Sequence, residues 1–340
     1  MTLNLITDVS GLRVGHAHDE TRATGTTVVI VDDANVASVV TRGGAPGSRD
    51  TALLEPEMTQ RGANAFVLSG GSAYGLDAAG GVMAHLRSKG TGFRIGPAVI
   101  PIVSQAIVFD LLNGGDKDWG LEPIYWQLGL QAARAAAPGA FQIGTVGGGY
   151  GATTATFKGG TGSASQTTAS GYTVGALAIV NAVGSTTIGR GPHFWAAAVE
   201  RDGEFGGLGM PRTISASDLA LTLKGARPPP STTIAVVATD AVLTKAQAKR
   251  LAIMADDGLA RAIRPAHAPM DGDTVFAVAT LKKELPEGAE GPALTELGAA
   301  AGDCLARAIA RGVYEATALP FPGAVRAWRD VFPEHYRGTK

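Results

Sequence analysis

The pattern of apolar and polar residues along the chain predicts an alternation of buried strands and amphipathic helices. Unbroken runs of apolar or β-branched residues predict strands at residues 26–31, 36–40, 65–68, 172–183 and 232–239. Only a short polar turn separates the first two runs, so we expect them to pair as a hairpin.

Helical periodicity predicts most of the remaining elements. We expect helices that end near Ser88, span 122–136, begin at a Thr244 cap and span 292–317, with a short helical piece near 217–224. The helix that follows the cap has a core face of small and branched apolar residues, namely Ala248, Leu251, Ala255, Leu259 and Ala262.

The C-terminal tail, from Ala318 onward, shows no regular period. It carries three large aromatic residues, Trp328, Phe332 and Tyr336. Burial of such side chains is strongly favourable, so we expect the tail to pack on the body of the protein.

Composition and charge narrow the class of protein. The chain of 340 residues has a formal net charge of −1, with 17% charged and 45% apolar residues. This balance gives no electrostatic case for binding nucleic acid. The longest apolar run is interrupted by prolines and polar residues, so we expect no membrane association. The N-terminal residues do not have the pattern of a signal peptide, and a single cysteine, Cys304, allows no intrachain disulfide. We therefore expect a cytoplasmic protein with a free core cysteine.

Glycine is unusually frequent, at 47 residues, about twice its ordinary share. This frequency favours close backbone packing and loops with exposed N–H groups. Together with the low charge, it also favours a subunit that buries part of its surface in a homo-oligomer.

Two sequence patterns are typical of a metal site and of a nucleotide site, but each lacks residues that such a site needs. His16 and His18 would lie on one side of a strand, as a metal pair does, but no second ligand cluster follows in the sequence. The glycine block at 147–151 resembles a dinucleotide-binding turn, but no acidic residue closes a βαβ unit about 20 residues later. We therefore expect no metal and no cofactor.

A glycine-rich turn follows the predicted strand at 65–68. Its residues, 69–76, give the strand–turn–helix shape of phosphate loops and nucleophile elbows, yet they match neither motif. The turn either packs strand and helix tightly together or forms a wall of a substrate pocket. Ser72 and Tyr74 are the candidate pocket residues.

The strongest candidate for chemistry is the junction between Ser231 and Thr232. Pro228-Pro229-Pro230 fixes an extended approach, and a buried strand begins directly after it. A hydroxyl at the start of a core strand suits an N-terminal-nucleophile hydrolase. Thr232 would attack the Ser231 carbonyl, the chain would be cut, and the new α-amine would act as a local general base. The alternative is a proline linker that enters an ordinary strand.

Three polar residues at strand ends could complete such a site. Asp271 and Asp273 lie at the start of a strand, where period two places both carboxylates on one side. Asn181 ends an apolar strand and is a candidate oxyanion donor. The alternatives are a polar turn for the aspartates and a turn former for Asn181.

Several stretches taken together resemble one known family. They are Gly70-Gly71-Ser72-Ala73-Tyr74-Gly75-Leu76, the glycine block around Tyr150, Lys158, Asn181, Thr232-Thr233-Ile234 and Asp271-Gly272-Asp273-Thr274. Over about residues 8–317 the chain resembles the L-aminopeptidase/D-esterase family of self-cleaving N-terminal-nucleophile hydrolases. Within it, the Thr-Thr-Ile and Asp-Gly-Asp-Thr motifs look most like the 6-aminohexanoate-oligomer (nylon-oligomer) hydrolases.

The resemblance implies a fold and an assembly. The fold is an α/β (α+β) four-layer αββα sandwich, a single domain over 1–340 that is cut into a large chain, 1–231, and a small chain, 232–340. The two chains stay together and assemble into homotetramers or larger oligomers.

The resemblance also implies roles for individual residues. It makes Thr232 the nucleophile, Lys158 a supporting amine, Asn181 the oxyanion donor and Asp271 with Asp273 the carboxylate pair. It further suggests oxyanion contacts for Tyr150, with lower specificity. From the chemistry we expect Lys158 to lie beside the carboxylate pair and to keep it ionised. The residue before the nucleophile, usually asparagine or glycine in this family, is Ser231 here.

These observations predict a self-activated amide hydrolase. Its substrates would be linear amides, that is 6-aminohexanoate oligomers, small peptides or β-peptides, and it would form an acyl-enzyme on Thr232 without a cofactor. The alternatives are an aminopeptidase/D-esterase with short-peptide substrates and an acyltransferase that uses the same threonine. A further alternative is a non-enzymatic protein whose glycine-rich loops bind phosphate.

Overall fold

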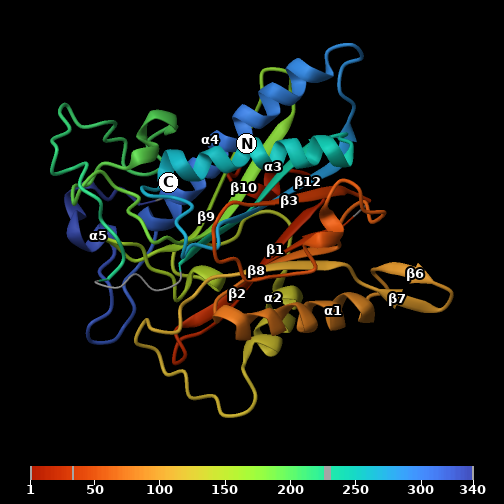
Figure 1. The fold of residues 1–340 in the computed structure, drawn as a ribbon, viewed down its shortest axis with the longest axis horizontal. Coiled ribbons are helices and arrows are strands. Elements are labelled where there is room, and N and C mark those ends of the chain that lie inside the picture. Colours follow the sequence, from red (N-terminus) through yellow and green to blue (C-terminus); the bar gives the residue numbers. More distant parts are fainter. Residues whose placement is uncertain (1, 33, 226–230, 339–340) are drawn as a thin grey trace.

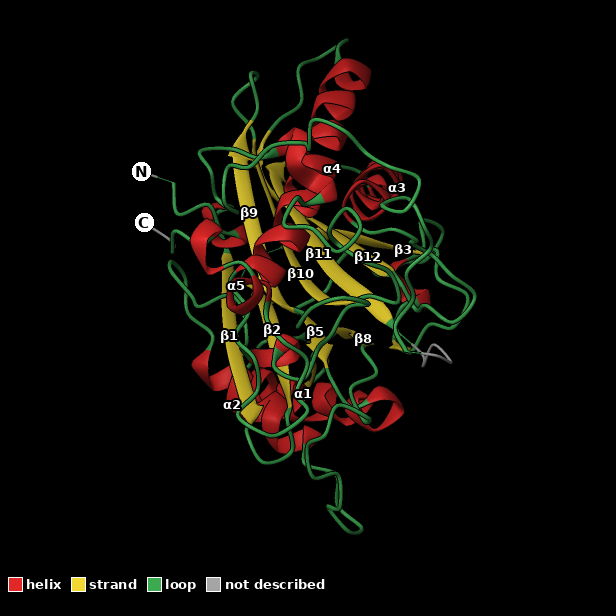
Figure 2. Cartoon of the chain, turned by 90° about the vertical axis from the view of Figure 1, so that its left-hand side faces the viewer, coloured by secondary structure: helices red, strands yellow, loops and turns green. Residues whose placement is uncertain are grey.

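Two five-stranded sheets stacked face to face form the centre of the molecule, and helices cover both outer faces (Figures 1 and 2). The computed structural model describes residues 2–32, 34–225 and 231–338. The layers are therefore helix, sheet, sheet and helix, as the resemblance implies.

The first sheet has the strand order β1-β2-β5-β8-β4, and only the β5–β8 pair is parallel. Its strands are β1 (Leu12–Asp19), β2 (Thr24–Val31), β5 (Ala65–Ser69), β8 (Val103–Ile107) and β4 (Ser48–Arg49). Helices α1 (Ala78–Ser88) and α2 (Tyr125–Ala135) cover its outer face (Figure 2).

The second sheet has the order β3-β12-β11-β10-β9, and only the β11–β12 pair is parallel. Its strands are β3 (Val36–Thr41), β12 (Thr274–Lys283), β11 (Thr232–Ala241), β10 (Thr173–Asn181) and β9 (Gly160–Thr167). Helices α3 (Lys245–Ala262) and α4 (Glu290–Tyr314) cover its outer face (Figure 2).

The other elements lie outside the two sheets. A hairpin of β6 (Phe93–Ile95) and β7 (Ala98–Ile100) projects from the body (Figure 1). The short helix α5 (Trp328–Val331) lies in the tail. Short 3₁₀ helices are Ile6–Asp8, Ala52–Leu54, Ser72–Asp77, Gly147–Gly149, Trp195–Val199 and Pro333–His335.

Strand β11 shows why its sequence is apolar at almost every position. Ile234 and Val236 face the core between the two sheets. Ala235 and Val237 face the core under the helices. A strand that is covered on both faces loses the alternation of apolar and polar residues, as its sequence indicates.

Most predicted elements are confirmed, including the Thr244 cap at the start of α3. The Thr244 side chain accepts a hydrogen bond from Gln247 N at 3.2 Å, and the Gln247 side chain accepts one from Thr244 N at 2.8 Å. The tail packs as expected, because Trp328 is fully buried. Cys304 is a free, buried cysteine.

The predicted hairpin of residues 26–31 and 36–40 is wrong. Both segments are strands, but β2 pairs with β1 and β5, whereas β3 pairs with β12 in the other sheet. The link between them, in which residue 33 lies outside the described residues, therefore connects the two layers. Apolar periodicity identifies a strand without specifying its partner, and both strands are buried enough to suit either sheet.

Two further differences concern local structure. Residues 217–224 form no helix: a turn ends at Leu219 and irregular chain follows, although the Asp218 carboxylate accepts hydrogen bonds from the Ser215 backbone and hydroxyl, as in a capping box. Strand β9 is not predicted, because it is rich in glycine, serine and threonine. A Cβ at its Gly162 would lie 1.8 Å from Ala308 O, so α4 can pack against β9 only where the side chain is absent.

We expect Arg307→Ala to destabilise the fold strongly. Arg307 is 2% exposed, and its guanidinium pairs with the buried Glu204 and donates to Ser165 O at 3.0 Å. Removal of one partner leaves Glu204 buried with fewer donors, which costs about 3–5 kcal/mol in the free energy of unfolding. Denaturant unfolding measures this cost. The control is Arg261→Ala, which breaks an exposed pair with Asp303 and should cost about 0–1 kcal/mol. Equal costs would contradict the assignment.

Candidate active site

Four of the predicted site residues meet at one end of the second sheet. Thr232 begins β11 and lies directly opposite Asn181, which ends β10. On the other side of β11, the segment that leads into β12 carries Asp271 and Asp273, and Asp271 forms a β-bridge with Ser231. Figure 2 shows β10, β11 and β12 side by side. The sheet therefore brings together residues that are far apart in the sequence.

The peptide bond before Thr232 is buried and held by its own backbone contacts. The Ser231 N–H donates to Met270 O at 3.1 Å, and the Ser231 carbonyl accepts from Gly272 N at 2.9 Å. The Thr232 hydroxyl also donates to the Ser231 carbonyl. The predicted proline approach, 228–230, lies outside the described residues.

Gly272 is needed at this position for steric reasons. A Cβ there would lie 2.8 Å from the Thr232 Oγ and 2.8 Å from Ala45 O. Any larger residue would therefore displace the hydroxyl or the neighbouring backbone.

Both predicted carboxylates are buried, each 2% exposed. Asp273 is fully engaged: Oδ1 accepts from Thr233 N at 2.7 Å, and Oδ2 accepts from His267 N at 3.0 Å. Asp271 Oδ2 accepts from Ala268 N at 3.2 Å, whereas its Oδ1 has no hydrogen-bond partner among the described residues. A buried carboxylate oxygen without a donor is costly, so a further donor would be favoured there.

The surroundings of Asp271 perturb its pKa. Burial, and then the negative charge of Asp273, raise the pKa of Asp271 to about 7. A raised carboxyl pKa is a common property of general acids and bases in active sites.

Asn181 is held in place on both sides of its amide. Its Oδ1 accepts from Thr153 N at 3.0 Å and from Lys224 Nζ at 3.0 Å, and its Nδ2 donates to Phe109 O at 2.9 Å. One of the two Nδ2 hydrogens serves that contact, so the second is the one that could reach a reacting oxygen.

Lys224, rather than Lys158, acts electrostatically on the carboxylate pair, whereas the contacts of Lys158 are with backbone carbonyls. The charge of Lys224 lowers the pKa of Asp271. Lys158 is 1% exposed and donates to Gly149 O at 3.0 Å and Gly159 O at 2.8 Å. Burial lowers the pKa of both lysines to about 7.

A buried aspartate, Asp110, lies close enough to act electrostatically on both lysines. It raises the pKa of Lys158 and Lys224 against the effect of burial, which also raises the pKa of Asp110 itself. Asp110 Oδ1 accepts from Gly71 N at 2.8 Å, so it also holds the glycine-rich turn. Sequence reasoning missed Asp110, although an acidic residue inside the otherwise apolar run 106–112 was a visible signal.

The remaining predicted residues take part in other contacts. Ser72 begins the 3₁₀ turn and donates its N–H to Val108 O at 3.0 Å. Tyr74 is 52% exposed. Tyr150 is buried and stacks on His18, with ring centroids 4.5 Å apart. Their proposed pocket or oxyanion roles stay predictions.

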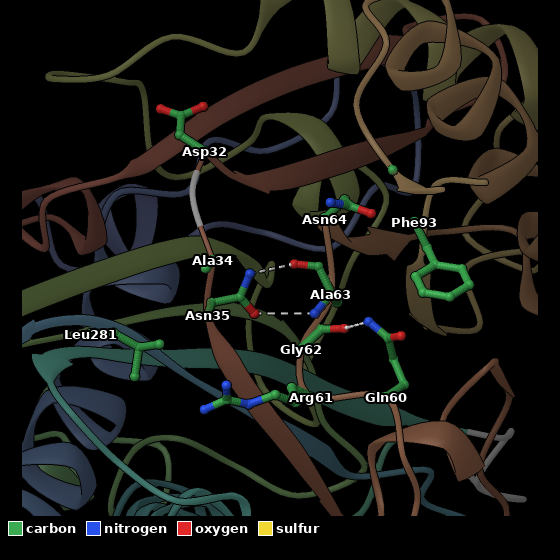
Figure 3. A pocket seen from close by; sticks show the side chains of 11 residues that line it. Asp32, Ala34, Asn35, Gln60, Arg61, Gly62, Ala63, Asn64, Phe93 and Leu281 are labelled. Atoms are coloured by element: carbon green, nitrogen blue, oxygen red, sulfur yellow. Dashed lines mark hydrogen bonds between the residues drawn. The ribbon is translucent and has the colours of Figure 1, made fainter. Parts of the chain in front are cut away.

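A hollow of about 480 Å³ lies at the opposite end of the second sheet (Figure 3). Its lining includes Asn35, which precedes β3, and Leu281 near the end of β12. The catalytic candidates lie at the other end of these strands, where Thr41 pairs with Thr274. Figure 3 shows Asn35 hydrogen-bonded to the backbone of Ala63, so this side chain is structural and the hollow is separate from the candidate site.

Among the described residues, no group of three or more histidine, cysteine, aspartate or glutamate side chains is placed to hold a metal ion. His16 instead shares a hydrogen bond with the Thr27 hydroxyl at 2.9 Å. No helix in the described part of the chain is both long and apolar enough to cross a bilayer.

Comparison with known proteins identifies relatives over most of the chain. The sequence model of peptidase family S58 matches residues 4–325. An uncharacterized aminopeptidase of Mycobacterium bovis is 44% identical over 349 aligned positions, which cover 97% of this chain and 98% of the relative. A 6-aminohexanoate-oligomer endohydrolase of Agromyces sp. is 28% identical, with 82% of this chain and 76% of that protein covered.

Solved structures share the fold. A Burkholderia sp. β-aminopeptidase superposes with a TM-score of 0.70 at 24% identity, covering 99% of this chain and 96% of that chain. The L-aminopeptidase D-Ala-esterase/amidase of Ochrobactrum anthropi, described as a variant of the Ntn-hydrolase fold, gives a TM-score of 0.68 at 22% identity. It covers 98% of this chain and 95% of that chain. The predicted family resemblance and fold class are confirmed.

Proposed function

The chain belongs to peptidase family S58 and is a hydrolase of amide or peptide bonds, and from that premise we propose that it is a self-processing N-terminal-threonine hydrolase. The cut falls between Ser231 and Thr232, and Thr232 is then the nucleophile for substrate. The large chain is 1–231 and the small chain is 232–340.

The observation that carries the proposal is the setting of the Ser231 carbonyl. It accepts hydrogen bonds from the Thr232 hydroxyl and from the Gly272 N–H. The nucleophile thus lies beside the group that it would attack, and a backbone donor is already aimed at the oxygen that would become an oxyanion. Such preorganisation is the largest single term in many acyl transfers.

Self-processing would proceed in two balanced steps. The Thr232 Oγ attacks the Ser231 carbonyl carbon and loses its proton, and the Thr232 nitrogen leaves as an amine after taking up a proton. The Ser231 acyl group is then an ester of Thr232. Water attacks that ester, which releases the Ser231 carboxylate and regenerates the hydroxyl on a residue that now bears a free α-amine.

The mature site would then reuse the same groups. The new α-amine has an ordinary pKa of about 7.7–8.0 and can take the proton of the Thr232 hydroxyl. Asp271 Oδ1, which lacks a partner among the described residues, is a suitable acceptor for that amine. Substrate acyl groups would pass to Thr232 and then to water, with Asn181 donating to the tetrahedral intermediate.

For substrate, we propose linear amides: 6-aminohexanoate oligomers, small peptides or β-peptides. Support comes from relatives named as a 6-aminohexanoate-oligomer endohydrolase and an aminopeptidase, and from a fold neighbour named as a β-aminopeptidase. We further propose a cytoplasmic homotetramer or larger assembly of the cleaved chains.

Intact-mass measurement with N-terminal sequencing tests the proposal directly. We expect two chains, 1–231 and 232–340, the second beginning Thr-Thr-Ile-Ala-Val. Active protein that remains a single 340-residue chain would refute the mechanism. A second chain that begins at Ser231 would keep the mechanism and move the nucleophile by one residue.

We expect Asn181→Ala to lower kcat about 10²–10³-fold, because an oxyanion donor acts mainly in the transition state. Steady-state kinetics on the best linear amide should show a much smaller change in KM. The Asn181 side chain also accepts hydrogen bonds from Thr153 N and Lys224 Nζ, so its loss could destabilise the fold. Thermal unfolding is the control that separates this effect from the effect on kcat. A rise in KM with unchanged kcat would instead make Asn181 a substrate-binding residue.

A further inference from the structure

His267 lies between two buried carboxylates, and one of them belongs to the candidate site. Its Nδ1 is 3.0 Å from Asp273 Oδ2, and its Nε2 is 3.3 Å from Asp256 Oδ2 on α3. Asp256 and Asp273 are 4% and 2% exposed. The imidazole thus connects helix α3 to the carboxylate that binds the backbone next to Thr232.

The backbone of His267 is itself held in an uncommon conformation. Its φ is +56°, in the left-handed region that most non-glycine residues avoid. From this conformation its own N–H also donates to Asp273 Oδ2, at 3.0 Å. Both the main chain and the side chain of one residue therefore fix a single carboxylate oxygen, which leaves Oδ1 free to hold Thr233 N.

We propose that His267 is a positioning residue for the amide hydrolysis, which locks Asp273 against Thr233 and is itself held by Asp256. This inference rests on the proposed function, in which Asp273 orients the nucleophile. His267 does not touch the reacting atoms; it acts through Asp273.

The charges around His267 make it a permanent cation at neutral pH. Its hydrogen bonds to Asp256 and Asp273 raise the pKa of His267 to about 10. The charged groups around this cluster include Arg42, whose Nε is 3.8 Å from Asp256 Oδ2, and Asp271, whose pKa responds to the charges of Asp273 and Lys224. Loss of the His267 charge would leave the buried negative charge of this cluster less compensated, so the raised pKa of Asp271 would rise further.

The decisive experiment compares His267→Asn with His267→Ala in the full-length protein. Asparagine tolerates a positive φ, and its amide can donate to Asp273 as Nδ1 does, but it carries no charge and does not reach Asp256. The pH dependence of kcat is measured on the linear amide that the wild-type protein hydrolyses fastest, chosen from aminohexanoate oligomers and short peptides. His193→Asn, which replaces a histidine that is bonded to Gly209 O and to neither Asp256 nor Asp273, is the matched control.

We expect His267→Ala to lower kcat up to about 10²-fold, with a smaller change in KM, because the geometry of Asp273 is lost. His267→Asn should recover part of that kcat. The fall of its kcat at low pH should nevertheless begin about one pH unit or more above that of the wild type. Asp256→Ala should lower kcat less than His267→Ala. The His193→Asn profile should match the wild type.

The inference is overturned if kcat of His267→Asn falls at the same low pH as kcat of the wild type. It is also overturned if wild type and His267→Ala have equal kcat. If His267→Ala does not fold, His267→Asn alone decides it. Thr232→Ala is assayed in parallel: if that variant retains turnover, the proposed function fails whatever the His267 variants do. If Thr232→Ala is inactive and the His267 variants keep the native profile, only the role of His267 fails.

Discussion

Thr232→Ala should yield one uncut chain of 340 residues that is folded and has no amide hydrolase activity. The substitution removes the hydroxyl that donates to the Ser231 carbonyl and that would attack it. Without that attack no α-amine forms, so both the nucleophile and the local base are lost. Intact mass, thermal unfolding and turnover of linear amides measure the three expected properties.

Thr232→Ser is the matched control, because it keeps the hydroxyl and loses only a methyl group. Threonine is restricted about χ1 and serine is not, so we expect this variant to cut the chain more slowly. The two fragments should stay together, since β11 is buried along all ten residues and its removal would expose a large apolar area. A cut Thr232→Ala chain would show that another group performs the processing.

The sequence predicts where strands and helices lie along the chain better than it predicts which strands pair in a sheet. The apolar runs at 232–239 and 172–183 become β11 and β10, and the Thr244 cap starts α3 as expected. Local patterns do not encode which sheet a strand joins, as β2 and β3 demonstrate. Strand β9 lacks an apolar pattern because its small residues accommodate the backbone of α4.

The candidate site was predictable to the extent that strand ends could be recognised. Thr232, Asn181 and the Asp271–Asp273 pair all lie where an apolar run begins or ends, and neighbouring strands bring these ends together. The contacts of Lys224 and His267 could not be predicted, because they depend on how a loop and α3 pack against those ends. The sequence does not show this packing, so Lys158 rather than Lys224 was expected to act on the carboxylates.

Asp273→Asn should lower kcat about 10²-fold or more, because Asp273 orients the nucleophile and a misplaced reacting group costs a rate factor of that size. Asp273 holds Thr233 N with one oxygen and His267 with the other. An asparagine has one acceptor oxygen, so its NH₂ group must face either the Thr233 N–H or the His267 donors. The register of Thr232 against its neighbours is then lost, and the negative charge that balances His267 is lost with it.

The effect on kcat is separable from a general loss of stability. Asp240 lies near the other end of β11, is also buried, and accepts from Thr173 N at 2.9 Å. Asp240→Asn therefore removes a buried carboxylate from the strand that carries Thr232, at the end far from the candidate site. We expect both variants to lose some resistance to thermal unfolding and only Asp273→Asn to lose turnover. Equal turnover in the two variants would refute the catalytic assignment of Asp273, because a buried charge alone would then explain its environment.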